Sequence, residues 1–335
     1  MTEYLNPSDR LVTVFGGSGF IGRYIVRAFA RRGWRVRAAV RRPDLAGFLQ
    51  PLGGVGQVQP VQANLRYPDS VAAAVVGAKI VINAAGVKSQ HGKQTYATVH
   101  EQGAGTVAAA AKAAGADQLI HISGIGVDAH SPNPYIVSKA RAEAAVQSAF
   151  PDATILRPSV VFGPEDEFFN RFGELARYFW ALPVFGGGKA KLQPVYVGDV
   201  ALAAAAALDD KLEAGAIYEL GGPEVMTLRE TIEFTLRIVE RKRALINLSS
   251  SASFALASLS ETASLLTLGK FPPAATITRD QLMLLGTDNI VSDAAIAEGR
   301  TLVGLGIAPQ GADAIAPSYL KRYRKTGQYE SSRFA

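Results

Sequence analysis

The sequence contains no cysteine in its 335 residues. This absence excludes disulfide bonds, thiolate zinc sites and cysteine nucleophiles, and it suits a reducing compartment. Histidine is also scarce, and His91, His100, His121 and His130 do not form a metal-ligating pair at helical spacing. No apolar run reaches the ~20 residues that a transmembrane helix needs. We therefore expect neither a metal site nor a transmembrane segment.

Acidic residues are outnumbered: 35 basic and 29 acidic side chains give a formal net charge of +6. Much of the excess lies near the C-terminus, at Lys321, Arg322, Arg324, Lys325 and Arg333. No zinc-finger, RNA-recognition or basic-zipper pattern accompanies these charges, so we do not expect nucleic-acid binding. Such a tail either contacts anionic lipid or an acidic partner, or is simply solvated, and the composition leaves both open.

The strongest pattern lies between Leu11 and Gly22, where the chain reads LVTVFGGSGFIG. An apolar β-type run meets a glycine-rich turn, and a helical pattern follows at once. Glycines permit the sharp turn and a close approach of backbone to a dinucleotide pyrophosphate, which the helix N-terminus attracts. The alternative is a glycine-rich turn without a ligand. The predicted cofactor contacts are Gly16, Ser18, Gly19, Phe20, Ile21 and Gly22.

The second predicted strand, residues 34–40, lacks the terminal carboxylate with which an NAD site usually binds the ribose 2′-OH. Arg41 and Arg42 occupy that place. Because a guanidinium pairs with a 2′-phosphate, the sequence favours NADP(H) over NAD(H). The alternative is that both arginines are solvated surface charges. Asp44 follows Pro43 and is predicted to cap a helix.

Strand and helix patterns alternate through the rest of the first half. They predict an α/β fold, a Rossmann-like doubly wound parallel sheet with a smaller, mostly helical C-terminal domain. Further strands are predicted at residues 58–63, 79–84, 118–123 and 154–157, and helices at 70–76, 94–115 and 134–150. The cofactor domain is predicted to span residues 1–165, with 191–221 returning to it. The smaller, partner-facing region then comprises 166–190 and 222–335.

A Tyr-x-x-x-Lys pair, Tyr135 and Lys139, lies in the last of these helices, and its spacing places both side chains on one face. Ser123 closes the preceding strand. An ammonium near a phenol favours phenolate, so the tyrosine is suited to exchange a proton with a substrate oxygen that the serine holds. These three residues are the predicted catalytic set. A purely structural role is the alternative.

With these motifs the chain resembles the extended, atypical short-chain dehydrogenase/reductase superfamily. The resemblance rests on GGSGFIG (16–22), NAAG (83–86), YIVSK (135–139), LRPSVVFGP (156–164) and VYVGDVA (195–201). Two departures from the family pattern are His100, where an asparagine is common, and Gly124, where a second serine often follows the first. They imply a weaker network behind the Tyr-Lys pair and weaker positioning of a substrate.

The same resemblance implies further cofactor contacts. Asn64 and Leu65 would flank the adenine, and Lys139 would bond the nicotinamide ribose. Pro158 and Ser159 would lie along the nicotinamide. The implied set is completed by the strand end Ala84, Ala85 and Gly86 and by Tyr135. The residue that matches Asp199 is implied to tie the substrate region to the sheet.

A narrower resemblance lies outside these generic motifs. Residues 163–201 and 278–292 are similar to the NADPH-binding accessory subunit family of respiratory complex I. That family implies tightly held, structural NADPH, other complex I subunits as partners, and a place on the peripheral arm near the membrane and the quinone-entry side. No Arg- and Ser-rich transit sequence or signal peptide precedes Leu11, so we expect the cytoplasmic face of a bacterial inner membrane.

Two apolar stretches in the second half carry less specific signals. Phe168, Phe169, Phe172, Leu175, Phe179 and Trp180 recur at helical spacing, for which core packing is the default explanation. Residues 253–268 project as a helix with one broad apolar arc. Such a helix would pack on a partner, lie at a membrane interface, or be buried in the small domain.

The sequence therefore supports two functions. The favoured one is an accessory subunit of complex I that retains NADPH without turnover. The alternative is a free-standing NADPH-dependent reductase or epimerase acting on a small carbonyl compound or quinone. The glycine-rich loop does not separate them, because both need it.

Overall fold

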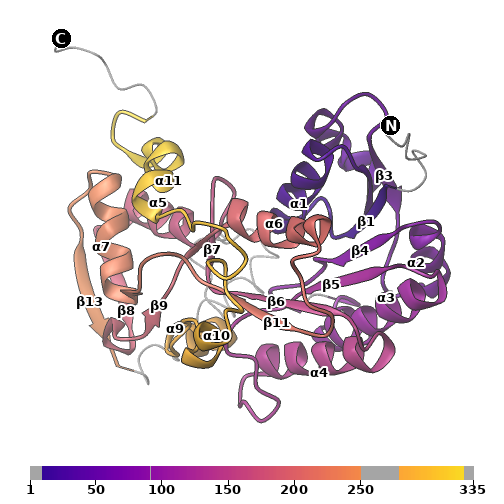
Figure 1. Ribbon diagram of the computed structural model, residues 1–335. Coiled ribbons are helices and arrows are strands. Elements are labelled where there is room, and N and C mark those ends of the chain that lie inside the picture. Colours follow the sequence, from indigo (N-terminus) through magenta and orange to yellow (C-terminus); the bar gives the residue numbers. More distant parts are fainter. Residues whose placement is uncertain (1–9, 91, 250–278, 328–335) are drawn as a thin grey trace. The chain divides into compact units, whose positions relative to one another are not determined.

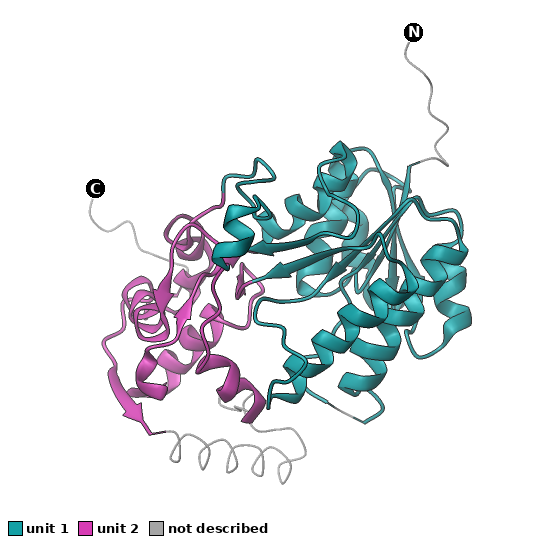
Figure 2. Ribbon diagram, turned by 60° about the horizontal axis from the view of Figure 1, so that its bottom comes forward, with its two compact units in different colours: residues 1–158, 197–220, 292–308 teal, residues 159–196, 221–291, 309–335 magenta. Residues whose placement is uncertain are grey.

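The computed structural model describes residues 10–90, 92–249 and 279–327. The chain divides into two compact units: residues 1–158, 197–220 and 292–308 form unit 1, and residues 159–196, 221–291 and 309–335 form unit 2 (Figure 2). The unit boundaries differ from the predicted ones. Residues 159–165, residues 191–196 and Gly221 lie in unit 2. Residues 292–308 lie in unit 1, where Arg300 O accepts from Glu219 N at 3.0 Å and Ser292 N donates to the Glu219 carboxylate at 2.8 Å.

Unit 1 is built on one seven-stranded sheet in which every pairing is parallel (Figure 1). From edge to edge its strands are β11 (Ile217–Leu220), β6 (Thr154–Pro158), β5 (Gln118–Ile122), β4 (Ile80–Asn83), β1 (Leu11–Phe15), β2 (Arg35–Val40) and β3 (Val58–Gln62). The order reverses at β1, as in a doubly wound sheet. This confirms the predicted fold class.

Helices cover both faces of this sheet (Figure 1). The first face carries α1 (Phe20–Arg31) and α6 (Val197–Ala205), which contact each other. The second carries α2 (Pro68–Val75), α3 (Gln102–Ala113) and α4 (Pro134–Ala149). The long helix predicted at 94–115 is divided, since a π-helical turn at Ala97–Glu101 precedes α3. Asn133 caps α4 by accepting from Tyr135 N.

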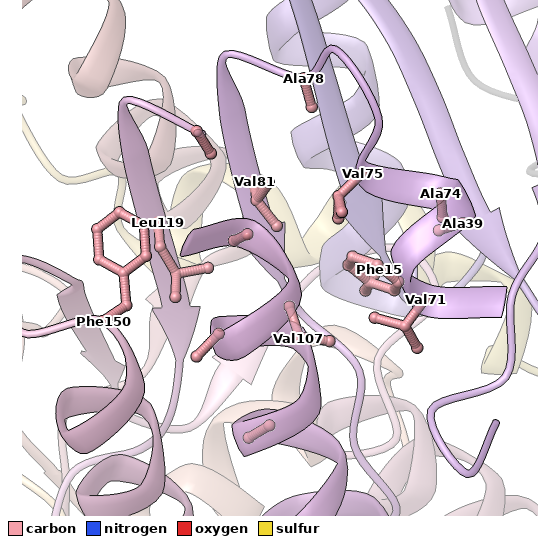
Figure 3. Packing of buried hydrophobic residues seen from close by; sticks show 14 of the residues in the cluster. Phe15, Ala39, Val71, Ala74, Val75, Ala78, Val81, Val107, Leu119 and Phe150 are labelled. Atoms are coloured by element: carbon pink, nitrogen blue, oxygen red, sulfur yellow. The ribbon is translucent and has the colours of Figure 1, made fainter. Parts of the chain in front are cut away.

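The core beneath α2, α3 and α4 is made of small side chains (Figure 3). Phe15, Val81 and Leu119 project from three neighbouring strands and are almost fully buried. The facing helices contribute mostly alanine and valine, such as Ala104, Val107, Ala108, Ala142 and Val146. Side chains of this size let α3 and α4 lie close to the sheet and to each other. This packing fixes the position of α4, the helix that carries Tyr135 and Lys139, against the sheet.

Unit 2 combines helices with short two-stranded pairs. Among its described residues the α-helices are α5 (Phe169–Tyr178), α7 (Leu228–Ile238), α9 (Arg279–Leu285) and α11 (Ala312–Leu320), while α10 (Asp293–Ala297) belongs to unit 1. The pairs are β7 (Val161–Phe162) with β10 (Val195–Tyr196), β9 (Lys191–Leu192) with β12 (Met226–Thr227), and β8 (Ala181–Phe185) with β13 (Ala244–Leu248). Thr227 and Glu230 close a capping box on α7.

Asp166 organises the start of α5. Its buried carboxylate accepts from the backbone N–H groups of Gly163, Phe168 and Asn170 at 2.8–3.0 Å and from the Tyr319 hydroxyl at 2.7 Å. Burial, together with this carboxylate, raises the pKa of Tyr319. The hydrogen bond from Tyr319 joins α11 to the start of α5, although the two residues are 153 positions apart in the sequence.

The expected aromatic core face is only partly right. Phe169 and Phe172 are buried in the unit 2 core, but Phe179 and Trp180 are exposed. The helix ends at Tyr178, and Phe179 already has an extended backbone (φ −109°, ψ 145°). The two residues therefore leave the helix face on which their spacing would have placed them.

Two stretches of the C-terminal half were predicted to contact a membrane or a partner: residues 253–268 and residues 321–325. The apolar arc at 253–268 lies outside the described residues and stays a prediction. In the described ranges 10–90, 92–249 and 279–327, no helix combines the length and hydropathy needed to cross a bilayer. The basic stretch 321–325 is described, and Lys321–Tyr323 form a 3₁₀ turn there.

Candidate cofactor site

The predicted site residues of unit 1 converge on one edge of the sheet. Because all seven strands are parallel, their carboxyl ends lie at the same edge. The glycine-rich loop follows β1, Arg41 follows β2, Asn64 follows β3, Ala84 follows β4 and Ser123 follows β5. In doubly wound sheets ligands bind at this edge, next to the position where the strand order reverses.

Glycine is required in the loop by two close backbone approaches. Gly16 has φ +74°, and a Cβ there would lie 2.8 Å from Ala84 O. At Gly22 a Cβ would lie 2.1 Å from Gly16 O, because the first turn of α1 presses onto the loop. Gly19 is less crowded, with Gly16 O at 3.1 Å, and is exposed. The loop backbone is thus closely packed on the side that faces the sheet, and it is exposed to solvent at Gly19.

The N-terminus of α1 is open to an anion. Its N-cap residue is Gly19, which has no side chain to cap the helix, and its first turn holds no acidic residue. The free N–H groups and the helix dipole favour a phosphate there. These features fit a dinucleotide pyrophosphate at Gly16, Ser18, Gly19, Phe20, Ile21 and Gly22.

Arg23, in the first turn of α1, contacts the loop, and the sequence analysis missed it. Its guanidinium donates to Gly19 O at 3.2 Å and to Ser18 O at 3.1 Å, and it lies 4.9 Å from the centre of the exposed Phe48 ring. The side chain therefore links the loop to the segment after β2. The arginine directly after GFIG was the available signal.

Arg41 and Arg42 are both exposed after β2, but they are not equivalent. Arg42 forms a bidentate pair with Asp44, with Nε–Oδ1 3.0 Å and Nη2–Oδ2 2.7 Å. This hydrogen bond raises the pKa of Arg42 and lowers the pKa of Asp44. Asp44 was expected to cap a helix, and that is wrong. It lies inside a three-residue 3₁₀ turn, Pro43–Leu45, whose N-cap is Arg42.

Asn64 and Leu65 follow β3 and are half-buried. Asn64 Oδ1 accepts from Arg66 N at 3.2 Å, and Asn64 N donates to Ser70 Oγ at 3.0 Å. Leu65 lies against Gly103 of α3, where a Cβ would be 3.0 Å away. The turn is therefore fixed by its own polar groups, and Leu65 offers an apolar surface.

The Ala84–Gly86 strand end is held from both sides. Ala84 N donates to Phe15 O at 3.0 Å, and Asn83 Oδ1 accepts from Ala85 N at 3.2 Å. A Cβ on the exposed Gly86 would lie 3.4 Å from His100 Nε2 and 3.9 Å from Lys139 Nζ. The glycine thus sits beside the Tyr-Lys helix.

Tyr135 and Lys139 lie on α4, and Ser123 follows β5; the expected activation of the phenol stays a prediction. Lys139 Nζ is 6.0 Å from the centre of the Tyr135 ring and donates to Ile122 O at 3.4 Å. Burial raises the pKa of Tyr135 and lowers the pKa of Lys139 to about 8, against an opposing effect of Glu143. Within the described part of the chain, the buried Ser123 hydroxyl has no hydrogen-bond partner.

His100 forms the support behind this helix. Its Nε2 accepts from Val87 N at 2.9 Å, and its Nδ1 lies 2.9 Å from Ser138 Oγ, which itself donates to Tyr135 O. These bonds assign the neutral ring with the proton on Nδ1. The ring also stacks on Tyr96 and meets the edge of Tyr135. His100 thus supplies hydrogen bonds behind the Tyr-Lys helix, and whether they are weaker than those of an asparagine stays a prediction.

A second buried histidine, His121, lies on β5 beside Asn83 of β4. Asn83 Nδ2 lies 3.2 Å from His121 Nδ1, which therefore accepts. Burial and the Lys139 ammonium lower the pKa of both His100 and His121 to about 3, so both rings are neutral. Neither histidine was recognised as a site residue from sequence, because the hydrogen bonds that define its position are made with residues distant in the chain.

Three further predicted residues lie at the ends of the sheet or beyond it. Pro158 ends β6 in unit 1, and Asp199 is fully buried in the first turn of α6. Ser159 opens unit 2, where its hydroxyl contacts Asn289 O at 2.8 Å and Asn289 Oδ1 at 2.6 Å. No group of acidic or histidine side chains suited to a metal ion occurs among the described residues.

A family model described as NAD(P)H-binding matches residues 16–170, and one described as the 3-beta hydroxysteroid dehydrogenase/isomerase family matches residues 127–218. The first model covers the loop, the strand ends and α4, so the chain carries an NAD(P)H-binding domain. Among solved structures, the fold is similar to that of triphenylmethane reductase from Citrobacter sp. The TM-score is 0.71 at 18% identity, covering 92% of this chain and 99% of the other.

Two relatives match almost the whole sequence. NADH dehydrogenase (ubiquinone) 1 alpha subcomplex subunit 9, mitochondrial, of Arabidopsis thaliana is 34% identical over 96% of this chain and 79% of its own length. The NADH-ubiquinone oxidoreductase 40 kDa subunit, mitochondrial, of Neurospora crassa is 29% identical over 95% of this chain and 80% of its own. The chain therefore belongs to the NADH dehydrogenase (ubiquinone) 1 alpha subcomplex subunit 9 family, within the extended short-chain dehydrogenase/reductase-like NAD(P)-binding proteins.

Proposed function

We propose that this protein is an accessory subunit of bacterial respiratory complex I that holds NADPH as a structural cofactor. The observation that carries the proposal is the match over nearly the full chain to subunits of this complex. That match extends beyond residues 16–170, the part that a nicotinamide-binding fold alone would explain. Both units of the molecule thus share the relatives' sequence.

The cofactor would lie along the carboxyl edge of the sheet. The loop and the α1 N-terminus would hold the pyrophosphate, and Asn64 and Leu65 would flank the adenine. Ala84–Gly86, Tyr135, Lys139, Pro158 and Ser159 would surround the nicotinamide and its ribose. When bound, the nicotinamide supplies hydride chemistry. The protein residues hold and orient it, and Lys139 offers an ammonium donor buried beneath Gly86.

Selectivity for NADPH is assigned to Arg41. In the described structure its guanidinium forms no ion pair, whereas Asp44 neutralises Arg42. Arg41→Ala should reduce the preference for NADPH over NADH by about 10- to 150-fold, the value of one charge-assisted bidentate contact of roughly 1.5–3 kcal/mol. Calorimetric titration of the apo protein with both nucleotides measures this.

The matched control is Arg42→Ala. On a logarithmic scale it should change the preference for NADPH by less than half as much as Arg41→Ala does, because the charge of Arg42 is already paired with Asp44. Equal affinities for the two nucleotides in the wild type would reject the NADPH assignment. A preference that survives Arg41→Ala and is lost in Arg42→Ala would move the assignment to Arg42.

Retention without turnover is supported by the state of the tyrosine. Burial raises the pKa of Tyr135, and the Lys139 ammonium is 6.0 Å from the ring centre, so these contacts do not favour the phenolate. Tyr135→Phe should therefore leave NADPH content and assembly unchanged. Lys139→Ala, the comparison variant, should reduce NADPH content, because it removes a buried donor. Nucleotide content of purified complexes, measured by extraction and chromatography, separates the two outcomes.

The alternative function is a free-standing NADPH-dependent reductase or epimerase of the short-chain dehydrogenase type. It is favoured by the one observation that Ser123, Tyr135 and Lys139 are all present at the edge where the cofactor would bind. In that case Tyr135→Phe should lower turnover of a small carbonyl compound or quinone by about 10²–10⁴-fold. Such a loss would replace the subunit proposal.

We place the protein at the cytoplasmic face of the inner membrane, near the quinone-entry side of the complex, held there by other subunits. Lys321 to Lys325 would add a contact with anionic lipid of about 1 kcal/mol for each charge near the surface. Salt screens that contribution but not a packed protein interface. After a high-salt wash of membranes, the protein should still co-migrate with NADH:ubiquinone oxidoreductase activity on a native gel. Recovery as a free soluble protein at low salt would reject the proposal.

A further inference from the structure

Three large aromatic side chains follow one another on the surface of unit 2. Arg177, Tyr178, Phe179 and Trp180 run from the last turn of α5 to the start of β8, and all four are exposed. The exposed fractions are 68% for Tyr178, 47% for Phe179 and 78% for Trp180. Single exposed apolar residues are ordinary, but a contiguous aromatic patch marks an interaction site.

Hydrogen bonds bring two basic segments of unit 2 to this patch. Ala244 N donates to Trp180 O at 3.2 Å, and Arg243 Nε donates to Ala176 O at 2.8 Å. Arg241 Nε in turn donates to Tyr323 O at 2.7 Å. Residues 177–180, 237–243 and 321–325 therefore meet, and we call them together the basic–aromatic surface.

The charge of the basic–aromatic surface is strongly one-sided. Its three segments contain nine Lys or Arg residues and a single acidic residue, Glu240, which pairs with Arg324 at 3.1 Å. The guanidinium groups of Arg241 and Arg243 donate to the backbone carbonyls of Tyr323 and Ala176. Burial, and then the neighbouring Arg243 and Arg177, lower the pKa of Arg241, as expected where cations crowd without counterions. Such a surface is complementary to a dense array of negative charge.

The surface is also hollowed. A groove of about 760 Å³ opens along α7 and β13. Five basic residues line it, together with the acidic Glu233 and Glu240 and the apolar Leu236 and Leu245; the basic ones are Arg229, Arg237, Arg241, Lys242 and Arg243. Guanidinium groups bind phosphate bidentately, and apolar groups beside them accept acyl or glycerol carbons. The groove thus matches a group that has an anionic phosphate next to an apolar body.

We propose that the basic–aromatic surface docks on the headgroup layer of an anionic phospholipid bilayer. Tyrosine and tryptophan favour the membrane–water interface, where an apolar ring and a polar tip are both accommodated, and lysine and arginine there bind anionic headgroups. An acidic protein surface would match the same charge, and the experiment below separates that occupant from lipid. The inference rests on the proposed place of the subunit at a membrane, and it adds the side that faces the lipid.

Vesicle flotation with the purified full chain tests the proposal. The protein should float with phosphatidylcholine vesicles that contain a third of phosphatidylglycerol, and not with phosphatidylcholine alone. Arg177→Ala/Lys242→Ala should weaken the partition coefficient by about 30-fold, since two charges are lost near the surface. Both side chains are exposed, so the fold should be unaffected. Trp180→Ala, made alone, should also weaken binding to these vesicles. The salt dependence of binding should then stay as in the wild type.

The matched control is Arg27→Ala/Arg31→Ala, two exposed charges on α1 of unit 1, which should float as the wild type does. Equal loss of flotation in both double variants would mean that net charge, and not this surface, binds the vesicles, and would overturn the proposal. So would a wild type that ignores anionic vesicles while Arg177→Ala/Lys242→Ala loses co-migration with the oxidoreductase, because the occupant is then an acidic protein. Flotation without any co-migration would instead reject the proposed function and retain this surface.

Discussion

Replacement of Gly22 by alanine should abolish NADPH retention and lower the free energy of unfolding by about 3 kcal/mol. The new Cβ would lie 2.1 Å from Gly16 O and 2.8 Å from Gly16 C, and both atoms belong to the backbone of the loop. They cannot rotate away as a side chain can. The loop must shift outward, and it then no longer follows the path that brings bare backbone to the pyrophosphate.

Gly47→Ala is the control for this variant. Gly47 follows β2 in the same unit, its φ is ordinary, and a Cβ there would meet no atom within 4 Å. Urea unfolding and nucleotide content should match the wild type. If Gly22→Ala also retains NADPH at the wild-type level, the nucleotide lies elsewhere on the molecule.

Acid should destabilise the protein steeply between pH 6.5 and 4. Burial and Lys139 hold the pKa of His100 and of His121 at about 3 in the folded chain, below the ordinary histidine value of 6.5. The unfolded chain therefore binds more protons in this window, so stability is complete above pH 6.5 and is lost as the pH falls toward 3. Two such groups give a slope of up to about 2.7 kcal/mol per pH unit.

Urea unfolding at half-unit steps of pH measures this slope. His121→Gln should remove about half of it, even if the variant is less stable at every pH, because one buried imidazole is gone. His130→Gln should leave the slope unchanged, since His130 is exposed. A wild-type slope near zero between pH 6 and 4.5 would show that the two histidines are already charged in the folded state.

The parts of the site that depend on local backbone were predictable from sequence. Gly16 and Gly22 are forced by approaches within one strand–turn–helix unit, and four-residue spacing places Tyr135 and Lys139 on one face of α4. Fold class followed in the same way, from alternating strand and helix patterns. These features repeat in any chain that forms the same local structure.

The features that the sequence did not reveal depend on contacts with other residues of the chain or on where an element ends. His100 acts through Val87 and Ser138, which are 13 and 38 residues away. The Asp44 carboxylate turned to Arg42 because the predicted helix is a three-residue turn, a difference in length that the pattern does not encode. Trp180 is exposed because α5 stops two residues earlier, at a position where nothing in the apolar spacing changes.

The division of unit 1 into three stretches of chain has a consequence for synthesis on the ribosome. The outer edge of β6 remains unpaired until β11, residues 217–220, has emerged, and Glu219 of that strand receives its bonds from Ser292 and Arg300 later still. All of residues 159–196 and 221–291 must be made in between. A nascent chain stalled after residue 158 therefore presents an open strand edge, a site for mispairing. Separate expression of residues 1–158 reproduces that exposed intermediate instead of a finished nucleotide-binding domain.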